Sequence, residues 1–342
     1  MTDSGDGSAP DVSVSIVNTS SRDLLLACLE SLESDRGGPV SVEVTVLDNA
    51  SEDGSAEAVR ERFPWASVIA QRHRAGFGAN HNTVIRATRG RYVYVLNEDA
   101  TVEPGSFERL VAYMDSHAEV GAAGPQIRYP DGRHQPSAWR FPSPAAAALG
   151  TLTLSRVGIE QSRGDEPRRV DWAMGCALLV RREALDRIGL FDESFFIYSE
   201  ETDLCRRLAD AGYETLFLPQ VTVFHHVSQF SAEVPERRIN EEWRSRARYW
   251  RKHHSPLAAR GTALLTGLQY AARAAVGEAV LHLPEGRRPV RIDTAAPARF
   301  RLHARNAWAG VRGPGLREYA EEWNRAHPEV GRPPDEGAGA AS

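Results

Sequence analysis

The stretch VSVSIVNTSSRDLLLACLESLESDRGGPVSVEVTVLD, residues 12–48, decides the fold class of this 342-residue chain. Its two ends, 12–18 and 42–48, are runs rich in β-branched residues and predict strands. Leucines recur between them at helical spacing and predict a helix over 22–34. A strand, a helix and a strand in this order are typical of a βαβ unit, in which the two strands run parallel.

The same alternation continues downstream. A helix is predicted over 54–62, a strand over 66–70, a further helix that ends at Gly90, and a strand over 91–97. We therefore expect an α/β fold built on a doubly wound, mostly parallel sheet, whose ligands bind at the carboxyl ends of the strands. The polar residues at those ends are Asn18, Asp48, Asn49, Asn97, Glu98 and Asp99.

The second half of the chain is organised differently. After a helix over 104–117, the stretch 124–170 is broken by proline and glycine and suits substrate-shaping loops better than a sheet core. The elements expected next are a strand at 176–181, a helix at 182–188, the acidic and aromatic segment 191–213, two strands (ETLFLP and VTVFHH) separated by a proline turn, and two helices within 236–283.

Composition and charge exclude several classes of protein. With 42% hydrophobic residues and a formal net charge of -5, the chain has a globular composition and no basic field for nucleic acid. Lys252 is the only lysine, which argues against a Walker-type nucleotidase. Cys28, Cys176 and Cys205 each lie in an apolar stretch, as buried thiols in a reducing cytosol do. No run of about 18 apolar residues occurs, so we expect neither a secreted nor an integral membrane protein.

Two strand ends carry candidate metal ligands. The loop LNEDA, 96–100, places Asp99 after a buried strand, where its carboxylate either holds a hard divalent cation or belongs to an ordinary turn. His225 and His226 end a later strand and point to opposite faces, so at most one of them faces the ligand crevice. Imidazole suits several divalent metals but is a minority ligand for Mg²⁺.

The helix start SEETDLCRR, 199–207, crowds three carboxylates into its first turn: Glu200, Glu201 and Asp203. Acidic residues at this end of a helix complement its dipole, so acidity alone does not indicate catalysis. The preceding FFIY favours function, because it places the helix start in apolar surroundings where a carboxyl keeps a raised pKa.

Three further segments leave alternatives open. RAGFGANHN, 74–82, lacks the third glycine of a dinucleotide fingerprint but can present a helix N-terminus to a phosphate. The basic helix 237–252 is either a solvated helix with its aromatic residues inside or a contact for an anionic membrane surface. The apolar helix 257–283 can pack on the catalytic domain, pair with a second copy or lie on lipid.

Seven motifs in one order carry a family resemblance. They are SIVN (15–18), VLDNASEDGS (46–55), GFGAN (76–80), YVLNEDA (94–100), VDWAMGCALLVRREAL (170–185), FDESFFIYSEETDLCRRLADAGY (191–213) and VFHHVSQFS (223–231). Together they resemble the inverting glycosyltransferases of family 2 with a GT-A fold, particularly the rhamnosyltransferase-like branch. The resemblance spans residues 12 to about 230 and implies a Rossmann-like GT-A sheet, followed here by a C-terminal helical extension.

The resemblance implies how a nucleotide-sugar donor binds. Asp48 meets the base of the nucleotide, Asp99 binds a Mg²⁺ or Mn²⁺ ion that bridges the diphosphate, and His225 adds a metal contact. The residues implied to bind the nucleotide-sugar are Asn18, Asp48, Asn49, Gly76, Asn82, Asn97 and Asp99.

The resemblance also implies a catalytic base at the acidic helix start. The family's Glu-Asp pair falls on Glu200 and Glu201, and Glu201 is our first choice for the group that deprotonates the acceptor hydroxyl. Asp203 has a supporting role. Trp172 and Gly175 are the acceptor-binding candidates, and Trp172 is equally consistent with a core position.

These roles divide the chain into parts. We expect disordered tails at 1–10 and 328–342, a GT-A catalytic domain at 11–235 with a nucleotide-sugar half (11–120) and an acceptor half (121–235), and the helical extension at 236–327.

The resulting expectation is a metal-dependent enzyme of cell-wall or polysaccharide synthesis. It moves rhamnose or another deoxysugar from a dTDP or UDP donor to a hydroxyl of a glycan or lipid-linked acceptor, in the cytoplasm or at the inner face of the cell membrane. Glu201 stands where the family has aspartate, Arg74 where asparagine is common and Val84 where glycine is frequent. A catalytically idle sugar-nucleotide-binding protein and, last, a nucleotidyltransferase are the alternatives.

Overall fold

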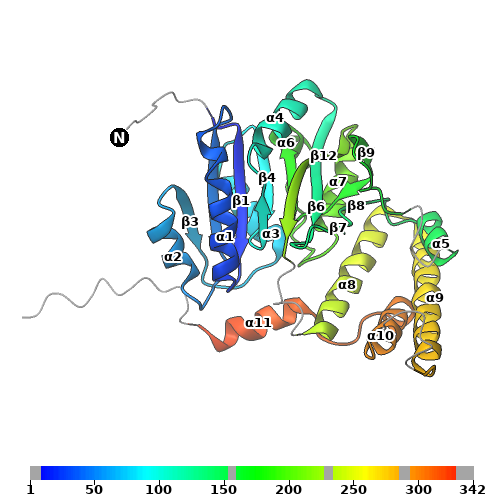
Figure 1. Ribbon diagram of the computed structural model, residues 1–342. Coiled ribbons are helices and arrows are strands. Elements are labelled where there is room, and N and C mark those ends of the chain that lie inside the picture. The colour runs from blue at the N-terminus through cyan, green and yellow to red at the C-terminus, as the bar shows by residue number, and fades with distance from the viewer. Residues whose placement is uncertain (1–8, 153–158, 227–233, 285–292, 329–342) are drawn as a thin grey trace, which may run out of the picture.

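The computed structural model describes residues 9–152, 159–226, 234–284 and 293–328, and Figure 1 shows a large sheet between two layers of helices with a helical extension beside it. The strands are β1 (Val12–Asn18), β2 (Val42–Asp48), β3 (Ala66–Ala70), β4 (Tyr92–Asn97), β5 (Ala100–Val102), β6 (Val120–Arg128), β7 (His134–Gln135), β8 (Ala138–Trp139), β9 (Arg168–Val170), β10 (Trp172–Ala173), β11 (Ala177–Arg181) and β12 (Glu214–His225). The helices are α1 (Arg22–Leu32), the short 3₁₀ turn η1 (Asp35–Gly37), α2 (Ser55–Arg62), α3 (Phe77–Ala87), α4 (Ser106–Ser116), α5 (Pro144–Leu152), α6 (Arg182–Ile188), α7 (Glu200–Asp210), α8 (Pro235–His253), α9 (Pro256–Leu281), α10 (Ala296–Ala309) and α11 (Leu316–Ala326).

The order of strands in the large sheet is β3-β2-β1-β4-β11-β6-β12-β5. All of its long strands run in one direction except β11, which is antiparallel to both β4 and β6. The register places Asn18 beside Asp48 and Val17 beside Asn97. The polar ends of the first, second and fourth strands therefore meet at one edge of the sheet, as the predicted doubly wound order requires.

The alternating sequence of β1 explains why both faces of the sheet are covered. Val14 and Ile16 are buried in an apolar cluster shared with α1, α2 and α4. Ser15 points to the opposite face, where its hydroxyl lies 2.7 Å from Nδ1 of His81 on α3. Burial lowers the pKa of His81 to about 3, so this imidazole stays neutral. A second apolar cluster, with residues of α3, α6 and α7, completes that face.

Two sequence-based predictions in the second half were wrong. The stretch beginning at residue 124 is not all loop, because β6 continues through it inside the sheet. Gly121 and Gly124 allow close packing there. A Cβ at Gly121 would come within 3.0 Å of Tyr213, and a Cβ at Gly124 would come within 3.0 Å of Ala173. The two strands expected around the proline turn form one strand, β12, with a shift of register between Leu218 and Thr222.

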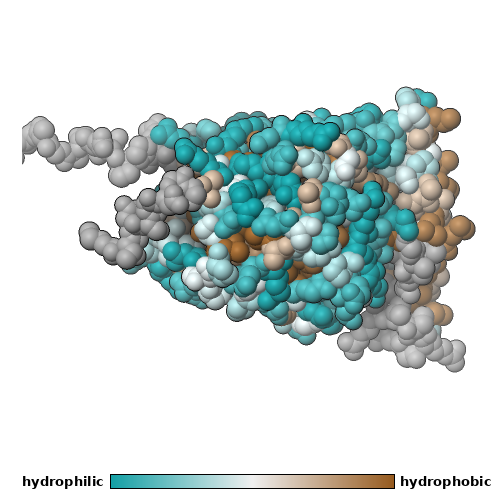
Figure 2. Space-filling view, turned by 90° about the horizontal axis from the view of Figure 1, so that it is seen from above, coloured by the Kyte–Doolittle hydropathy of each residue, from teal (hydrophilic) through white to brown (hydrophobic). Residues whose placement is uncertain are grey.

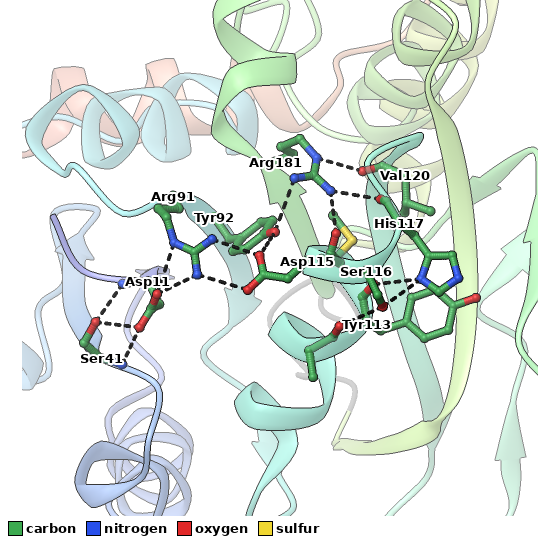
Figure 3. A network of polar contacts seen from close by, with 12 residues as sticks. Asp11, Ser41, Arg91, Tyr92, Tyr113, Asp115, Ser116, His117, Val120 and Arg181 are labelled. Carbon is green, nitrogen blue, oxygen red and sulfur yellow. Dashed lines mark hydrogen bonds and ion pairs between the residues drawn. The ribbon is translucent and has the colours of Figure 1, made fainter.

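The edge of the sheet opposite the polar strand ends is tied together by arginine. Figure 3 shows Arg91 between Asp11 and Asp115, at nitrogen–oxygen distances of 2.7 and 2.8 Å. Beside it Arg181, at the end of β11, donates to the carbonyl oxygens of Val120 and His117. These contacts fix the starts of β1, β4 and β6 relative to one another. They therefore also help to fix the relative positions of the polar carboxyl ends of these strands.

The basic helix predicted at 237–252 is α8, and its aromatic residues face inward. Trp243, Tyr249 and Trp250 are buried together with Phe195. In the part of the chain that the structure describes, no helix is both long and apolar enough to cross a membrane. The three cysteines are buried free thiols, as predicted.

Candidate functional site

A pocket of about 420 Å³ opens at the polar edge of the sheet, beside the carboxyl ends of β1 and β4. The predicted site residues that line it are Asn49, Asn97, Asp99, Gly175, Glu200, Glu201 and His225. They come from β4, β12, the start of α7 and connecting loops, one of which follows β2, so the fold collects residues that are up to 176 positions apart in the sequence (Asn49 to His225). The lining also contains residues that the sequence did not predict, among them Gln135, Tyr198, Arg238 and Tyr319.

Asp99 and His225 face each other in this pocket. Nε2 of His225 lies 3.2 Å from Oδ1 of Asp99, and both side chains are largely buried. The pairing of β12 with β5, which sets His225 opposite Ala100, brings the two together. On the other side of the ring, Gln135 contacts Nδ1 of His225 through its amide nitrogen at 3.0 Å or its amide oxygen at 3.3 Å. When the oxygen accepts a hydrogen bond from the Nδ1–H group, the neutral ring keeps the lone pair of Nε2 for a cation.

This pair fits a divalent cation that is shared with a substrate. The described residues contain no cluster of three or more His, Cys, Asp or Glu side chains arranged as a metal site. Asp99 and His225 thus offer one carboxylate and one imidazole, and a hard cation would take its remaining oxygen ligands from a diphosphate and water. Such a site gains metal affinity mainly when the phosphates are present.

Asn49 shapes the wall beside the strand ends. Its amide nitrogen donates to the hydroxyl of Thr19 at 3.0 Å, and its amide oxygen accepts from the backbone N–H of Ala75 at 2.8 Å. Asn18 and Asp48 lie behind this wall and do not line the pocket. The Asn18 amide reaches Asp48 at 3.4 Å, and the second oxygen of Asp48 accepts from the N–H of Ser51.

The start of α7 is held in an unusual backbone conformation. Tyr198 and Ser199 both have positive φ angles, 70° and 66°, immediately before Glu200. Left-handed conformations at two successive non-glycine residues are costly and cluster at functional sites. The segment is fixed by Ser245, whose hydroxyl donates to the carbonyl of Ile197, and by the N–H of Phe77, which donates to Phe196. This turn directs Glu200 and Glu201 to the pocket.

Gly76 belongs to this arrangement although it does not line the pocket. A Cβ at this position would collide with the carbonyl oxygen of Phe196. Glycine therefore allows the loop before α3 to pass close to the segment that precedes α7.

The two glutamates have different electrostatic surroundings. Burial raises the pKa of Glu200 well above its usual range, and the neighbouring charge of Glu201 raises it further. Burial also raises the pKa of Glu201, but backbone N–H donors, including that of Gly175, oppose this shift. Each carboxyl has one buried oxygen without a hydrogen-bond partner among the described residues. Glu201 is therefore the member of the pair that ionises more readily.

The buried Glu200 carboxyl should make stability depend on pH. Because its folded-state pKa is raised, the folded state binds more protons than the unfolded state, and stability falls as pH rises above the unfolded value. Glu200→Gln should therefore raise the free energy of unfolding more at about pH 8 than at about pH 5. Urea unfolding at both pH values measures this. Glu57→Gln, on a side chain 78% exposed, is the control, and an equal gain at both pH values would contradict the assignment.

Asp203 lies away from the pocket, in a cluster of cations. Its buried carboxylate contacts Arg207 at 2.8 Å, Lys252 at 2.8 Å and His253 at 2.7 Å. These contacts join α7 to the end of α8. The geometry gives Asp203 a place in the packing of the two helices and none in the pocket lining.

Asp203→Asn should therefore lower stability and leave donor binding intact. Removing one member of a buried ion-pair cluster costs about 3 kcal/mol, whereas an exposed pair contributes about 0–1 kcal/mol. Asp210→Asn is the matched control, because it breaks the exposed pair with Arg206 on the same helix. Urea unfolding compares the two variants. Lost turnover at unchanged stability would instead assign Asp203 to catalysis.

Asn82 and Trp172 also make contacts outside the pocket. Asn82 on α3 donates to the carbonyl of Phe191 at 2.9 Å and accepts from its N–H at 3.0 Å, which fastens α3 to the segment before α7. Trp172 stacks on Trp139 with ring centroids 4.6 Å apart, and its indole N–H donates to the backbone carbonyl of Arg140. In this structure Trp172 packs against another aromatic residue near the pocket but does not line it.

The C-terminal helix α11 forms one wall of the pocket. Leu316, Tyr319 and Ala320 line it, and Figure 1 shows α11 beneath the edge of the sheet where the polar strand ends lie. Together with Trp323, these residues have the spacing of one helix face. That spacing can be seen in the sequence, although the residues belong to no recognised motif.

Arg74 is anchored by the same helix. Its guanidinium lies 3.9 Å from the ring centroid of Trp323 and 3.5 Å from a carboxylate oxygen of Glu52. Its backbone N–H and carbonyl both bond the side chain of Asn324. The loop that precedes α3 is thus held between the sheet edge and α11.

Solved structures with the same architecture define the class of this fold. The mannosyltransferase PcManGT from Pyrobaculum calidifontis, in complex with GDP-Man and Mn²⁺, aligns with a TM-score of 0.56 at 19% identity, over 89% of this chain and 88% of that one. S. aureus TarS in complex with UDP-GlcNAc aligns with a TM-score of 0.54 at 14% identity, over 88% and 82%. The chain has the GT-A glycosyltransferase fold.

Sequence comparison then identifies the family. The family described as "Glycosyltransferase like family 2" matches residues 10–249, and this chain belongs to it. The N-acetylglucosaminyl-diphospho-decaprenol L-rhamnosyltransferase of Mycobacterium tuberculosis is 32% identical over 238 residues, which cover 63% of this chain and 76% of that protein. The rhamnosyltransferase WbbL of Escherichia coli is 25% identical over 160 residues, 44% and 61% of the two chains. The chain is thus a glycosyltransferase of the rhamnosyltransferase-like branch.

Proposed function

We propose that this glycosyltransferase moves rhamnose or another deoxysugar from a dTDP or UDP donor to a hydroxyl of a lipid-linked glycan, with inversion at the anomeric carbon and with a divalent metal. The observation that supports this most is the joint lining of one pocket by Asp99 with His225 and by Glu200 with Glu201. The first pair suits the diphosphate of a donor and the second suits the hydroxyl of an acceptor.

The donor would lie along the strand ends. In this proposal Asn49, Asn97 and Asp99 contact the nucleotide-sugar directly, while Asn18 and Asp48 brace the loop around its base. Asp99 and His225 would hold the cation, which supplies positive charge to the diphosphate as it leaves. The wall made by α11 covers the donor and limits the access of water.

The acceptor hydroxyl would be activated at the start of α7. Glu201 accepts the hydroxyl proton as the oxygen attacks the anomeric carbon from the face opposite the diphosphate, so the configuration inverts. Glu200 stays protonated, because two adjacent buried carboxyls do not ionise together readily. The N–H of Gly175 supports the anionic form of Glu201.

The nature of the acceptor is suggested by a relative. The M. tuberculosis protein is named for a diphospho-decaprenol acceptor carrying N-acetylglucosamine and for L-rhamnose transfer. We extend that chemistry to this chain, together with a place in the cytoplasm at the inner face of the membrane.

Product analysis tests the proposal. The full chain is incubated with Mn²⁺, dTDP-rhamnose or a UDP-sugar, and a short polyprenyl-diphospho-N-acetylglucosamine acceptor. We expect a glycolipid heavier by one sugar in the mass spectrum and an inverted anomeric signal by NMR, and the rate at which this product forms should fall by about a hundredfold or more with Glu201→Gln. Tight donor binding without transfer to any acceptor offered would support an idle sugar-nucleotide-binding protein instead.

A further inference from the structure

The exposed large apolar side chains gather on one part of the molecule. Among the described residues all of them lie at the end of α5, on or just after α9, or on α10: Leu152, Leu257, Leu264, Leu268, Val276, Leu283 and Trp308. Figure 2 shows hydrophobic residues along one edge of the molecule, the edge at which α9 lies in Figure 1, next to a mostly hydrophilic surface. We call these seven residues the apolar face.

The apolar face follows the length of α9. This helix has 26 residues and is therefore about 39 Å long. Leu257, Leu264, Leu268 and Val276 are spaced by seven, four and eight positions, so they lie on one side of it. From Leu264 to Val276 the other exposed positions are Ala272 and Ala275, and the other side of the helix packs on α5 and α10. Exposed positions that are apolar throughout three turns of a helix are unusual for a surface that stays in water.

Arginines flank the stripe. Arg260 is exposed one turn before Leu264. Arg305 of α10 lies with Trp308 in a shallow groove whose opposite wall is made by α9, with alanines such as Ala275 and with Glu278. Glu278 is already paired with Arg301 of α10. Arg260 and Arg305 form no ion pair with the residues that the structure describes. Cations at the border of an apolar stripe suit a surface that is apolar inside and anionic at its rim.

Trp308 has the position of an interfacial anchor. The residue is 50% exposed, and its indole N–H donates to the carbonyl of Leu264 at 3.3 Å. The ring packs against Gly267, where a Cβ would collide with it. A tryptophan with a satisfied N–H and an exposed apolar edge is typical of residues at membrane–water interfaces.

The charges distinguish a bilayer from a second copy of the chain. Two copies that paired through the apolar face would bring the same arginines into one interface, where Glu278, an acidic residue of the groove, is already paired with Arg301. An anionic bilayer would meet those arginines with phosphates. Since the whole chain carries a net charge of -5, such a bilayer attracts it only through a local basic region of this kind.

We propose that the apolar face docks this protein onto a bilayer containing anionic phospholipid, with the leucines at the acyl boundary and Arg260 and Arg305 at the phosphates. The biological purpose rests on the proposed function, since a lipid-linked acceptor lies in such a bilayer. The docking itself rests on the surface and can be measured without donor or acceptor.

Vesicle flotation of the full chain tests the docking. We expect binding to vesicles with about one-third phosphatidylglycerol, weaker binding to pure phosphatidylcholine, and loss of the difference at high salt. Leu264→Ser with Leu268→Ser should weaken binding by roughly tenfold or more, because two leucines that would be buried in the bilayer are lost. Arg260→Gln with Arg305→Gln should do the same on anionic vesicles only.

The control variant also removes two arginine charges, but at positions away from the apolar face. Arg60→Gln with Arg89→Gln, on exposed side chains of the catalytic domain, should leave vesicle binding unchanged. Thermal unfolding and binding of a nucleoside diphosphate show whether each variant is folded. No binding of the wild-type chain to anionic vesicles, or equal binding by the leucine variant, overturns the proposal. A wild-type dimer that the leucine variant converts to a monomer, with vesicle binding unchanged, assigns the face to a second copy and also overturns it.

Discussion

Asp99→Asn should abolish metal-dependent donor binding. The substitution keeps the shape of the side chain but removes the carboxylate that faces His225 in the pocket. We expect the affinity for a nucleoside diphosphate in Mn²⁺ to fall by about a hundredfold or more, and turnover to fall with it. Calorimetric titration and initial rates measure the two losses.

The metal dependence of the loss separates charge from packing. Without Mn²⁺, wild type and Asp99→Asn should bind the nucleotide with similarly weak affinity, because the carboxylate then has no cation to hold. Glu57→Gln, far from the pocket on an exposed helix, should behave as wild type under both conditions. An Asp99→Asn variant that still gains affinity on addition of Mn²⁺ would remove Asp99 from the metal site.

Glu201→Gln should separate chemistry from donor binding. The amide cannot accept the proton of the acceptor hydroxyl, so we expect kcat to fall by about a hundredfold or more. The dissociation constant of the donor should stay unchanged, because the side chain lies on the acceptor side in our proposal. Steady-state rates, together with calorimetric titration of the donor, give both values.

Glu200→Gln is the informative comparison for this base. If Glu200 only stays protonated beside Glu201, its amide should retain most of the turnover and leave the pH at which the rate rises nearly unchanged, because a protonated Glu200 carries no charge and burial is what raises the pKa of Glu201. The wild-type rate should rise with pH as the base ionises. Full turnover in Glu201→Gln together with an inactive Glu200→Gln would reverse the two assignments.

Sequence patterns alone predict the nucleotide half of the fold. In the segment 12–18 valine and serine alternate over the first four positions, and the observed strand has the same bounds as the predicted one. The strands at 42–48 and 66–70 also match. Helices cover both faces of the sheet at these strands, so the local hydrophobic pattern agrees with the tertiary environment there.

The pattern fails where small residues are used for packing. In β6 the run VGAAGPQIR contains two glycines and a proline, which are signals of a turn, yet the strand is buried between β11 and β12. The glycines make room for Tyr213 and Ala173, which come from distant parts of the chain. A single sequence does not reveal such long-range fits.

The residues of the candidate site also fall into those that the sequence predicts and those that it does not. Asp99, Glu201 and His225 stand at element ends, where chemistry-bearing residues can be recognised from spacing, and all three line the pocket. Gln135 and Tyr319 line it as well, but neither belongs to a motif, and α11 reaches the pocket only through the fold of the whole C-terminal extension. Asp203 is acidic like Glu200 and lies in the same first turn of α7, and its partners on α8 show that it points elsewhere.

Calorimetric titration with dTDP, UDP and GDP, each with and without Mn²⁺, is the most direct test of the donor site. We predict tight binding of one pyrimidine nucleoside diphosphate that depends on Mn²⁺ and is lost in Asp99→Asn. That result would fix the class of donor and the role of the metal before the acceptor is known. Absence of binding to all three nucleotides under both conditions would contradict the assignment of this pocket to a nucleotide-sugar.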